Sequence, residues 1–455
     1  MNRLSAGFAR ADVTPMLGIP INGYYKERFM EGVLDPLEIN ALALSCADQK
    51  ALILNMDNCG IVSTARVDEF RRYVEEVTGV PYEGIYLSFT HSHTAGALDT
   101  VDPTANWVSD YTKIDQYSAF VKEKFALAAK MALDDLKPAR MGFGAGKAEN
   151  IAFIRRFRMK DGSVRTNPGV NNPDILSPIG DIDDTVKVIR FDRENADTIV
   201  FVSFTCHPDV VGGNQVSADW PGFLRRRVEL ALPGTKCIFL NGCEGDINHV
   251  NVHPKGGDFN DMFNDFDGVS RGYGHARHMG NVVAAGVLQI FDKVEYRDVE
   301  SIAASQTTVE IPSNMPAPED MPEAYHIEEF HAAGRDDDLP YKGMDLTTKV
   351  AEAERMIRLE HGPESFPLYL TALRIGDVCL AGIPGEPFNG VSVGLRAYEG
   401  YDLIIPTCIT NGYEGYFPMK DSYDVGGYEA ATSIFKAGVA ELIVQEGIRL
   451  MDSIR

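Results

Sequence analysis

Two histidines separated by one serine, His91 and His93, stand in the stretch LSFTHSHTAG. The residues before them favour an extended chain, in which residues i and i+2 point to the same side. Both imidazoles would then face one cavity at the end of a strand. Neutral imidazole is a common ligand of zinc and other transition metals. The pair therefore indicates either a metal site or a structural pair held by backbone hydrogen bonds.

Three later stretches place polar side chains directly after apolar runs. His207 follows TIVFVSFTC, Glu386 follows VCLAGIPG, and ITNGYEGYFPMKDSYDVGGYEAATS contains four tyrosines, among them Tyr416 and Tyr428. Open α/β folds bind ligands beyond the ends of buried strands, so this shared location indicates one site. Taken singly, the glutamate would be a solvated loop residue and the tyrosines would be packing residues.

Two further stretches have side chains suited to substrate recognition. ENIAFIRRFRMKDGSVRTNPG clusters arginines, including Arg155 and Arg156, and a guanidinium suits a carboxylate or a polar carbonyl group. Exposed arginines paired with surface acids are the plainer interpretation. The turn FLNGCEGDINHVNVHP carries Glu244, Asp246 and Asn248. These polar side chains would line a pocket, or they would serve only the geometry of the turn.

The alternation of short apolar runs with helical patterns predicts an α/β architecture of mixed β-sheets flanked by helices. KALILNMD, IYLSFT, TVKVIRF, TIVFVSFTC, KCIFLNG, VCLAGIP and DLIIPTCIT have the composition of strands. A helix is predicted over 63–79, with Gly79 as its stop, and another over 117–138, closed by Pro138. A third is predicted over 221–234, with Pro221 in its first turn.

Composition limits the classes of function. The chain has 455 residues and a net charge of −23, so most of its surface would repel a polyanion, and nucleic acid is not an expected partner. Neither a secretory signal nor an apolar run of membrane-spanning length is visible, which predicts a cytoplasmic protein without membrane insertion. The seven cysteines contain no CxxC pair and indicate buried thiols rather than disulfides.

The chain is predicted to form a single domain over 1–455. No internal repeat or clear linker is visible, and the segments near 253–275 and 314–345 are rich in Gly, Asp, Glu and Pro with weak periodicity. They are predicted to be long loops or insertions. The sequence leaves open whether they cover a pocket or form an interface in a homo-oligomer.

Five collinear motifs resemble the neutral/alkaline ceramidase family. THSHTAG is similar to its THTHSG motif, and AGFARADVTP with GVLDPLEINALAL is similar to its amino-terminal signature. FLNGCEGDINHVN resembles its Gly-Asp turn, IPGEPF its Pro-Gly-Glu loop, and NGYEGYFPMKDSYDVGGYEAATSIF its carboxy-terminal tyrosine motif. The likeness runs in order over nearly the whole chain, and it implies a fold like the ceramidase catalytic domain.

The resemblance also implies a zinc site of amidase type. Matching motif positions make His91, His207, Glu386 and Tyr416 the ligands of Zn²⁺, with a water completing the sphere. His93 would lie beside the metal and transfer a proton or stabilise an oxyanion. Zinc lowers the pKa of bound water to about 7 and polarises a carbonyl group.

The remaining site residues are also implied by the resemblance. Tyr428 would be a second polar group at the reacting carbonyl, where it would donate to a developing oxyanion. Arg155 or Arg156 would correspond to a substrate-contacting arginine. Asp246 and Asn248 belong to the Gly-Asp turn, and they would contact the substrate from there.

Two departures from the family pattern argue against ceramide as substrate. The Gly-Asp turn of the family continues into a serine, whereas this chain reads GDIN and places Asn248 there. The chain also ends soon after the tyrosine motif, without the carboxy-terminal β-sandwich domain of the larger ceramidases. The prediction is a zinc-dependent hydrolase that cleaves an amide bond in a small soluble polar substrate.

Several alternatives stay open on the sequence. One is a ceramidase or another N-acyl amide hydrolase, and one is a zinc-dependent hydrolase or lyase acting on another bond. A TIM-barrel amidohydrolase also begins its metal site with His-x-His, although the later order of residues does not supply its further ligands. A metal-containing binding protein without turnover is the non-enzyme alternative.

Overall fold

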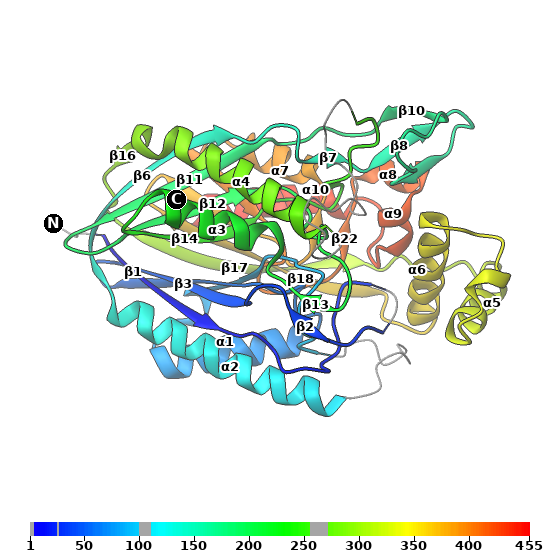
Figure 1. Cartoon of the computed structure of the whole chain (residues 1–455), viewed down its shortest axis with the longest axis horizontal. Helices are drawn as coiled ribbons and strands as arrows, with labels where there is room; N and C mark the ends of the chain where they lie inside the picture. The colour runs from blue at the N-terminus through cyan, green and yellow to red at the C-terminus, as the bar shows by residue number, and fades with distance from the viewer. Residues whose placement is uncertain (1–3, 25–26, 100–110, 255–271) are drawn as a thin grey trace.

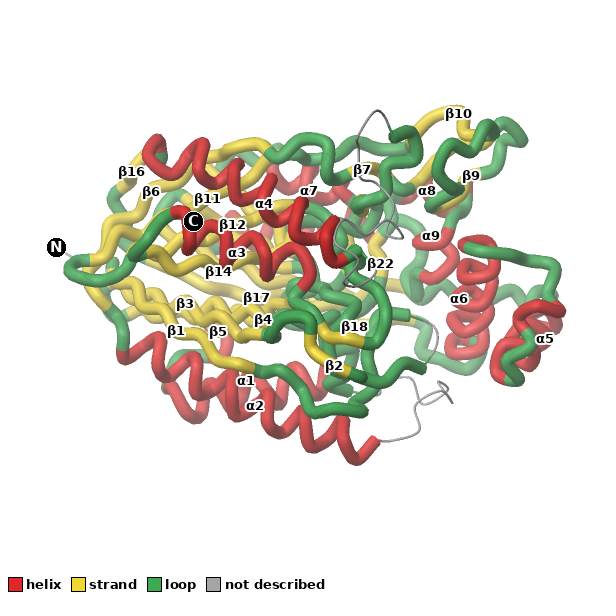
Figure 2. Tube along the Cα trace, viewed as in Figure 1, coloured by secondary structure: helices red, strands yellow, loops and turns green. Residues whose placement is uncertain are grey.

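The computed structural model describes residues 4–24, 27–99, 111–254 and 272–455, and its two main sheets lie face to face between helices (Figures 1 and 2). The larger sheet has the order β14-β12-β11-β6-β1-β3-β4-β5, with β16 paired to β6, and the smaller has the order β17-β18-β19-β21. Both sheets contain parallel and antiparallel pairs. Mixed sheets flanked by helices are the predicted class, which is confirmed.

The strands have the following bounds. Those of the larger sheet are β1 (Ser5–Asp12), β3 (Glu38–Cys46), β4 (Gln49–Met56), β5 (Ile85–Phe89), β6 (Lys137–Lys147), β11 (Thr185–Arg193), β12 (Thr198–Phe204), β14 (Thr235–Asn241) and β16 (Glu295–Arg297). Those of the smaller sheet are β17 (Ile302–Pro312), β18 (Ser365–Ile375), β19 (Val378–Gly382) and β21 (Leu403–Thr407). Short pairs lie outside them: β2 (Gly32–Val33) with β13 (Gln215–Val216), β7 (Phe153–Ile154) with β15 (Ile247–Asn248), β20 (Glu386–Pro387) with β22 (Tyr416–Phe417), and β8 (Arg156–Met159) with β9 (Val164–Thr166) and β10 (Ile175–Pro178).

Alternation along β3 shows how the larger sheet separates two cores. Ala41 and Ala43 belong to the core shared with the helices, whereas Leu42 and Leu44 belong to the core between the two sheets. Successive side chains of a strand point to opposite faces, so both faces of a buried strand are apolar. The predicted strands all form, because their continuous apolar runs fill both cores.

Helices cover the outer faces of both sheets. α1 (Thr64–Thr78) and α2 (Tyr111–Asp134) pack on one half of the larger sheet, and α3 (Asp219–Ala231) and α4 (Tyr273–Ile290) pack on the other half. α7 (Asn389–Arg396) and α10 (Val439–Ser453) pack on the smaller sheet. The short helices α8 (Lys420–Val425) and α9 (Tyr428–Thr432) lie in the tyrosine motif.

Helix ends test the predicted boundaries. Ser63 caps α1 by accepting the Arg66 N–H, and Gly79 ends it with a left-handed φ of 69°, as predicted. The predicted end of the second helix, at Pro138, was wrong. It stops at Asp134, and Pro138 lies inside β6 opposite Ser5. Proline is tolerated close to the first residue of a strand, where a ladder N–H is not needed.

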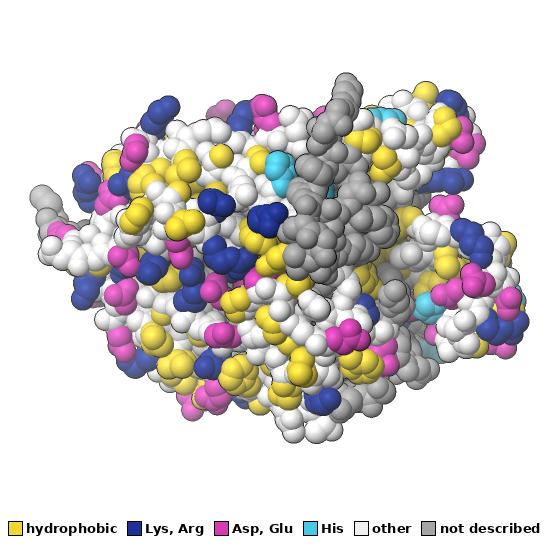
Figure 3. Space-filling view, in the orientation of Figure 1, with side chains coloured by type: hydrophobic (Ala, Val, Ile, Leu, Met, Phe, Trp, Pro, Cys, Tyr) yellow, Lys and Arg dark blue, Asp and Glu magenta, His cyan; other side chains and the backbone are white. Residues whose placement is uncertain are grey.

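The segment 314–345 is partly helical, which corrects the expectation of a loop. It contains α5 (Met321–Ala332), which packs against α6 (Met344–Leu359) around a small separate core that includes Met321, Ile327 and Val350. This α5–α6 hairpin projects from the body of the molecule (Figure 1), and acidic and basic side chains lie close together on it (Figure 3). Its few apolar residues recur at helical spacing within a polar stretch, which hid the periodicity.

The remaining expectations have different outcomes. The insertion near 253–275 lies mostly outside the described residues, and α4 begins at Tyr273. The seven cysteines are buried free thiols, as predicted. None of the described helices combines the length and the apolar character needed to cross a bilayer. The single-domain organisation and the cytoplasmic location stay predictions.

Candidate metal centre

The predicted metal ligands all follow strands that have a parallel neighbour. β5 runs parallel to β4, β12 to β14, and β19 to β21. His91 follows β5, His207 follows β12, Glu386 follows β19, and Tyr416 follows β21. Parallel neighbours end at the same edge of a sheet, and the two sheets lie face to face, so these residues meet at one end of the molecule.

The buried side chain of Asn241, the last residue of β14, ties these strand ends together. Its Nδ2 donates to the carbonyl oxygens of Thr90 at 3.3 Å and Cys206 at 3.1 Å. Its own backbone carbonyl accepts the N–H of Cys408 at 3.1 Å. Thr90 follows β5, Cys206 lies beyond β12, and Cys408 follows β21. The side chain and the backbone carbonyl of Asn241 together therefore fix the relative positions of the loops that carry the predicted ligands.

Backbone carbonyls fix the tautomers of two histidines. Nδ1 of His91 lies 2.8 Å from the carbonyl oxygen of Cys59, and Nδ1 of His207 lies 2.9 Å from that of Glu244. A carbonyl only accepts, so each Nδ1 carries the proton. In the neutral form Nε2 of each ring then has a free lone pair, which is the arrangement of a metal-binding histidine oriented by the backbone.

Both Nε2 atoms face the carboxylate of Glu386. Nε2 of His207 lies 2.9 Å and Nε2 of His91 3.5 Å from Glu386 Oε2. Burial lowers the pKa of His207 to about 4, so a neutral imidazole nitrogen faces a carboxylate oxygen, and neither atom makes a hydrogen bond within the described residues. Two acceptors at this distance repel each other unless a cation lies between them. The residues fit a divalent metal ion.

The charges of His91 and Glu386 show what a metal ion would replace. Although burial opposes it, Cys59 and Glu386 raise the pKa of His91 well above 6.5. Burial would raise the pKa of Glu386, yet His91 and His207 hold it well below 4.5. Without a metal, the proton on His91 therefore balances the buried carboxylate. A divalent ion would take over this role and leave both imidazoles neutral.

Tyr416 stands directly beside Glu386. The two residues are register partners in the parallel pair β20–β22. Burial raises the pKa of the Tyr416 phenol well above 10, Glu386 adds to this, and Arg155 opposes it. The guanidinium of Arg155 lies 5.3 Å from the centre of the Tyr416 ring. The predicted fourth ligand is therefore held between an anion and a cation.

The two predicted substrate arginines are committed to the protein itself. Nε of Arg155 donates to Glu429 Oε1 at 2.7 Å, and Nη1 of Arg156 donates to Ser422 Oγ at 2.9 Å. Glu429 also lies 3.7 Å from Nε of Arg156, and all three charged side chains are buried. They act as an internal ion-pair group beneath the tyrosine motif, and a substrate contact by either arginine stays a prediction.

His93 lies beside the cluster, as predicted, but the backbone conformation that places it there is not the predicted extended one. His91 has a left-handed φ of 72°, so the two histidines do not follow the alternation of an extended strand. Their Nε2 atoms still lie 3.1 Å apart. Nδ1 of His93 lies 3.7 Å from Asp209 Oδ1, and the hydroxyl of Tyr24 donates to the same carboxylate oxygen. His93 thus connects the cluster to an acidic group.

The turn after β14 holds its polar residues in structural contacts. Asp246 Oδ1 accepts the N–H of Asn389 at 2.9 Å. Asn248 Nδ2 donates to Asn167 Oδ1 at 2.9 Å, and its Oδ1 accepts the N–H of Val250. Both predicted substrate contacts are buried, and their role towards a substrate stays a prediction.

A cavity of about 230 Å³ adjoins the cluster on the side of the α5–α6 hairpin. Tyr416 and Tyr428 line it, with their rings 5.5 Å apart, together with Tyr413. α6 contributes Arg355 and Arg358. Predicted site residues and residues of the hairpin therefore share one cavity.

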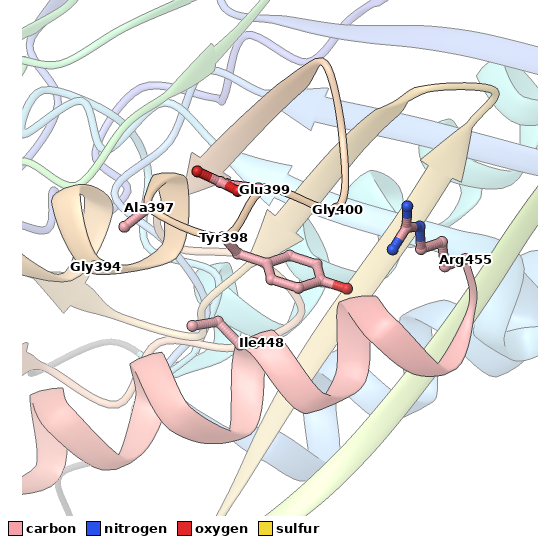
Figure 4. Close-up of a pocket in the computed structure, with 7 residues that line it drawn as sticks. All are labelled: Gly394, Ala397, Tyr398, Glu399, Gly400, Ile448 and Arg455. Atoms are coloured by element: carbon pink, nitrogen blue, oxygen red, sulfur yellow. The ribbon is translucent and has the colours of Figure 1, made fainter.

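A larger cavity of about 620 Å³ lies elsewhere, where the loop after α7 meets the end of α10 (Figure 4). Tyr398 and Arg455 line it, and the Tyr398 hydroxyl donates a hydrogen bond to Asp452 Oδ1 on α10 at 2.5 Å. It is lined by no histidine or cysteine, so its size alone does not make it the functional site.

Two residues of the cluster were not among the predicted ligands. The carboxylate of Glu244 lies within 4.8 Å of the metal-binding atoms of His91, His207 and Glu386. The hydroxyl of Tyr413 donates to Glu386 Oε1 at 2.8 Å. Both stand in motifs noted for their polar residues, but only the pairing of β12 with β14 and the fold of the last motif bring them to the cluster.

Comparison with known proteins identifies the fold. No family model matches the chain, and no curated protein matches it. Neutral ceramidase from Pseudomonas aeruginosa matches over 100% of this chain and 75% of its own, with a TM-score of 0.72 and 17% identity. A ceramidase complexed with C2 matches over 99% and 75%, with a TM-score of 0.71 and 17% identity. The expected ceramidase-like fold is confirmed, and the TIM-barrel alternative is wrong.

Proposed function

We propose that this protein is a metal-dependent hydrolase that uses Zn²⁺ to cleave amide bonds. The observation that carries the proposal is the convergence of two imidazole nitrogens of fixed tautomer on the buried carboxylate of Glu386. The shared fold with proteins named ceramidase supports the amide bond as the target. His91, His207, Glu386 and Tyr416 would hold the ion.

The protein side chains around the ion have separate tasks. A bound zinc ion would supply a Lewis acid for the carbonyl group and activate a water molecule. His93, placed between the cluster and Asp209, would accept and return a proton. Tyr428, on the wall of the cavity, would donate to the oxygen that gains charge. Tyr413 would hold Glu386 in place through its hydroxyl.

The substrate we propose is small and polar rather than a ceramide. The cavity beside the cluster has a volume of about 230 Å³ and is lined largely by tyrosines, arginines and glutamates. A long acyl chain needs an extended apolar lining. Arg358 is exposed on the cavity, and among the described residues its charge acts on Glu414 without a direct hydrogen bond or ion pair. An amide that carries a carboxylate fits this guanidinium.

A screen of N-acyl amino acids and other carboxylated amides tests the proposal, with mass-spectrometric detection of the released amine and acid. We expect turnover with zinc-loaded protein, and none with the chelated protein or with His93→Ala. A short-chain soluble ceramide serves as the comparison substrate. Preferred turnover of that ceramide would contradict the substrate class, while metal and ligand binding without any product would indicate a binding protein instead.

A further inference from the structure

Glu244 is a buried carboxylate that the predicted ligand set leaves without a task. It follows β14, its side chain is fully buried, and neither carboxylate oxygen makes a hydrogen bond within the described part of the chain. A buried ionisable group without a partner is costly. Burial raises the pKa of the neighbouring Cys408 thiol well above 9, and Glu244 adds to the effect.

The backbone around Glu244 presses this residue against the metal cluster. Its carbonyl oxygen accepts from Nδ1 of His207 at 2.9 Å. The next residue, Gly245, donates its N–H to Pro387 O at 2.9 Å, and a Cβ at Gly245 would lie 2.4 Å from the carbonyl oxygen of Glu386. Only glycine permits this close approach. The turn is therefore built so that Glu244 and Glu386 stand next to each other.

Two buried carboxylates beside one another repel unless one of them is protonated or a cation separates them. One carboxylate oxygen of Glu244 lies within 4.8 Å of the metal-binding atoms of His91, His207 and Glu386, which also lie within that distance of one another. The buried arginine next to the cluster, Arg155, is paired with Glu429. Arg155 is therefore not available to Glu244, and a divalent ion at the centre of the cluster would supply the charge that balances Glu244 as a carboxylate.

We propose that Glu244 is a further ligand of the metal ion. The ion would then be held by two imidazole nitrogens, two carboxylates and the phenol of Tyr416, an oxygen-rich set that raises the coordination number. Such a set accepts harder divalent ions such as Mn²⁺ and Fe²⁺ beside Zn²⁺. This inference rests on the proposed metal site, and it specifies which ions that site accepts.

Metal binding to chelator-stripped protein tests the inference without any substrate. Competition with a chromophoric chelator gives the Kd of Zn²⁺ and Mn²⁺ for the wild type and for Glu244→Gln, which keeps the shape and removes the charge. A residue that only orients a ligand costs about 10–100-fold in affinity. We expect a larger loss in Glu244→Gln, and a greater loss for Mn²⁺ than for Zn²⁺. Asp99→Asn, which removes another buried carboxylate, is the matched control and should keep the wild-type Kd.

The number of ligands around the bound ion tests directly whether Glu244 coordinates it. X-ray absorption of the zinc-loaded wild type should count at least five light-atom ligands, a result that does not depend on the folding of a variant. The visible spectrum of bound Co²⁺ should gain intensity in Glu244→Gln as the coordination number falls. Four-coordinate zinc in the wild type, or identical cobalt spectra in both proteins, would overturn the role of Glu244 alone. No bound ion in the wild type would overturn the proposed function as well.

Discussion

Glu386 and Tyr416 face each other as partners in a two-stranded parallel pair. Each strand of this pair is two residues long, so the pair is short and serves mainly to position these two side chains. It joins the loop after β19 to the loop after β21 at the residues proposed to hold the metal. Chain segments from neighbouring strands are thus locked together where the chemistry would occur.

Metal content is the first prediction. Purified wild-type protein should hold about one equivalent of a divalent transition ion by elemental analysis, and His91→Ala and His207→Ala should lose it because each removes a fixed Nε2 lone pair. His326→Ala removes an exposed histidine of α5 and should keep the ion. Equal metal content in all four proteins would contradict the site.

Removing the ion should lower thermal stability. A ligand that binds only the folded state at 100 times its Kd stabilises that state by about 2.7 kcal/mol. Chelation should therefore lower the Tm of the wild type by several degrees, measured by circular dichroism. His207→Ala, already without the ion, should show no further decrease, and a parallel decrease in this variant would mean that the chelator acts elsewhere.

His93 should be separable from metal binding. His93→Gln should keep the metal content of the wild type, because the predicted ligands stay in place, and should reduce kcat by about 10²–10⁴-fold through loss of proton transfer. Metal analysis and turnover of the same preparation check this. Loss of the ion in His93→Gln would show that His93 is a ligand rather than a neighbour.

Asn241 should contribute strongly to stability. Asn241→Ala removes an amide that bonds the loops after β5 and β12 and leaves buried carbonyl groups without donors. We expect a loss of about 2–4 kcal/mol in the free energy of unfolding, measured with denaturant on metal-free protein. Asn281→Ala, which removes one contact to Arg227, should change it by less than about 1 kcal/mol.

Asp99 should make stability depend on pH. Burial raises the pKa of Asp99 from 3.8 to about 6, so the folded state binds the proton more tightly than the unfolded state. Stability contributed by this group is then present below pH 3.8 and is lost as the pH rises to about 6. Asp99→Asn should be more stable than the wild type at pH 7.5, by up to ~3 kcal/mol, and the advantage should vanish near pH 3.8. An unchanged difference between these pH values would contradict the assignment.

Features that depend on residues close together in the sequence are predicted correctly. The strands and α1 follow from local periodicity, and His91, His207 and Glu386 could be placed at strand ends because each follows its strand directly. The ion pair of Arg155 with Glu429 could not be predicted, since it joins distant segments. Glu244 was noted only as a polar turn residue, because its approach to Glu386 depends on the packing of Gly245 against another loop.

His91 and His93 show that sequence patterns can also miss the backbone conformation of residues that are neighbours in the chain. Strand alternation predicted that His91 and His93 share one side, and their Nε2 atoms do meet. The reason is the left-handed backbone of His91, a conformation that costs an L-residue about 1–2 kcal/mol. Strain of this kind persists only where the surrounding structure imposes it, and no pattern in the local sequence signals it.

The proposed ligands come from loops spread between His91 and Tyr416, which spans most of the chain. A site with such high contact order cannot assemble until both sheets have formed and their ends have met. The ion would therefore enter at a late step of folding, when the last loops close. Metal uptake by a refolding chain would thus report the completion of the fold, and an unfolding intermediate that has lost β21 would no longer hold Tyr416 beside Glu386.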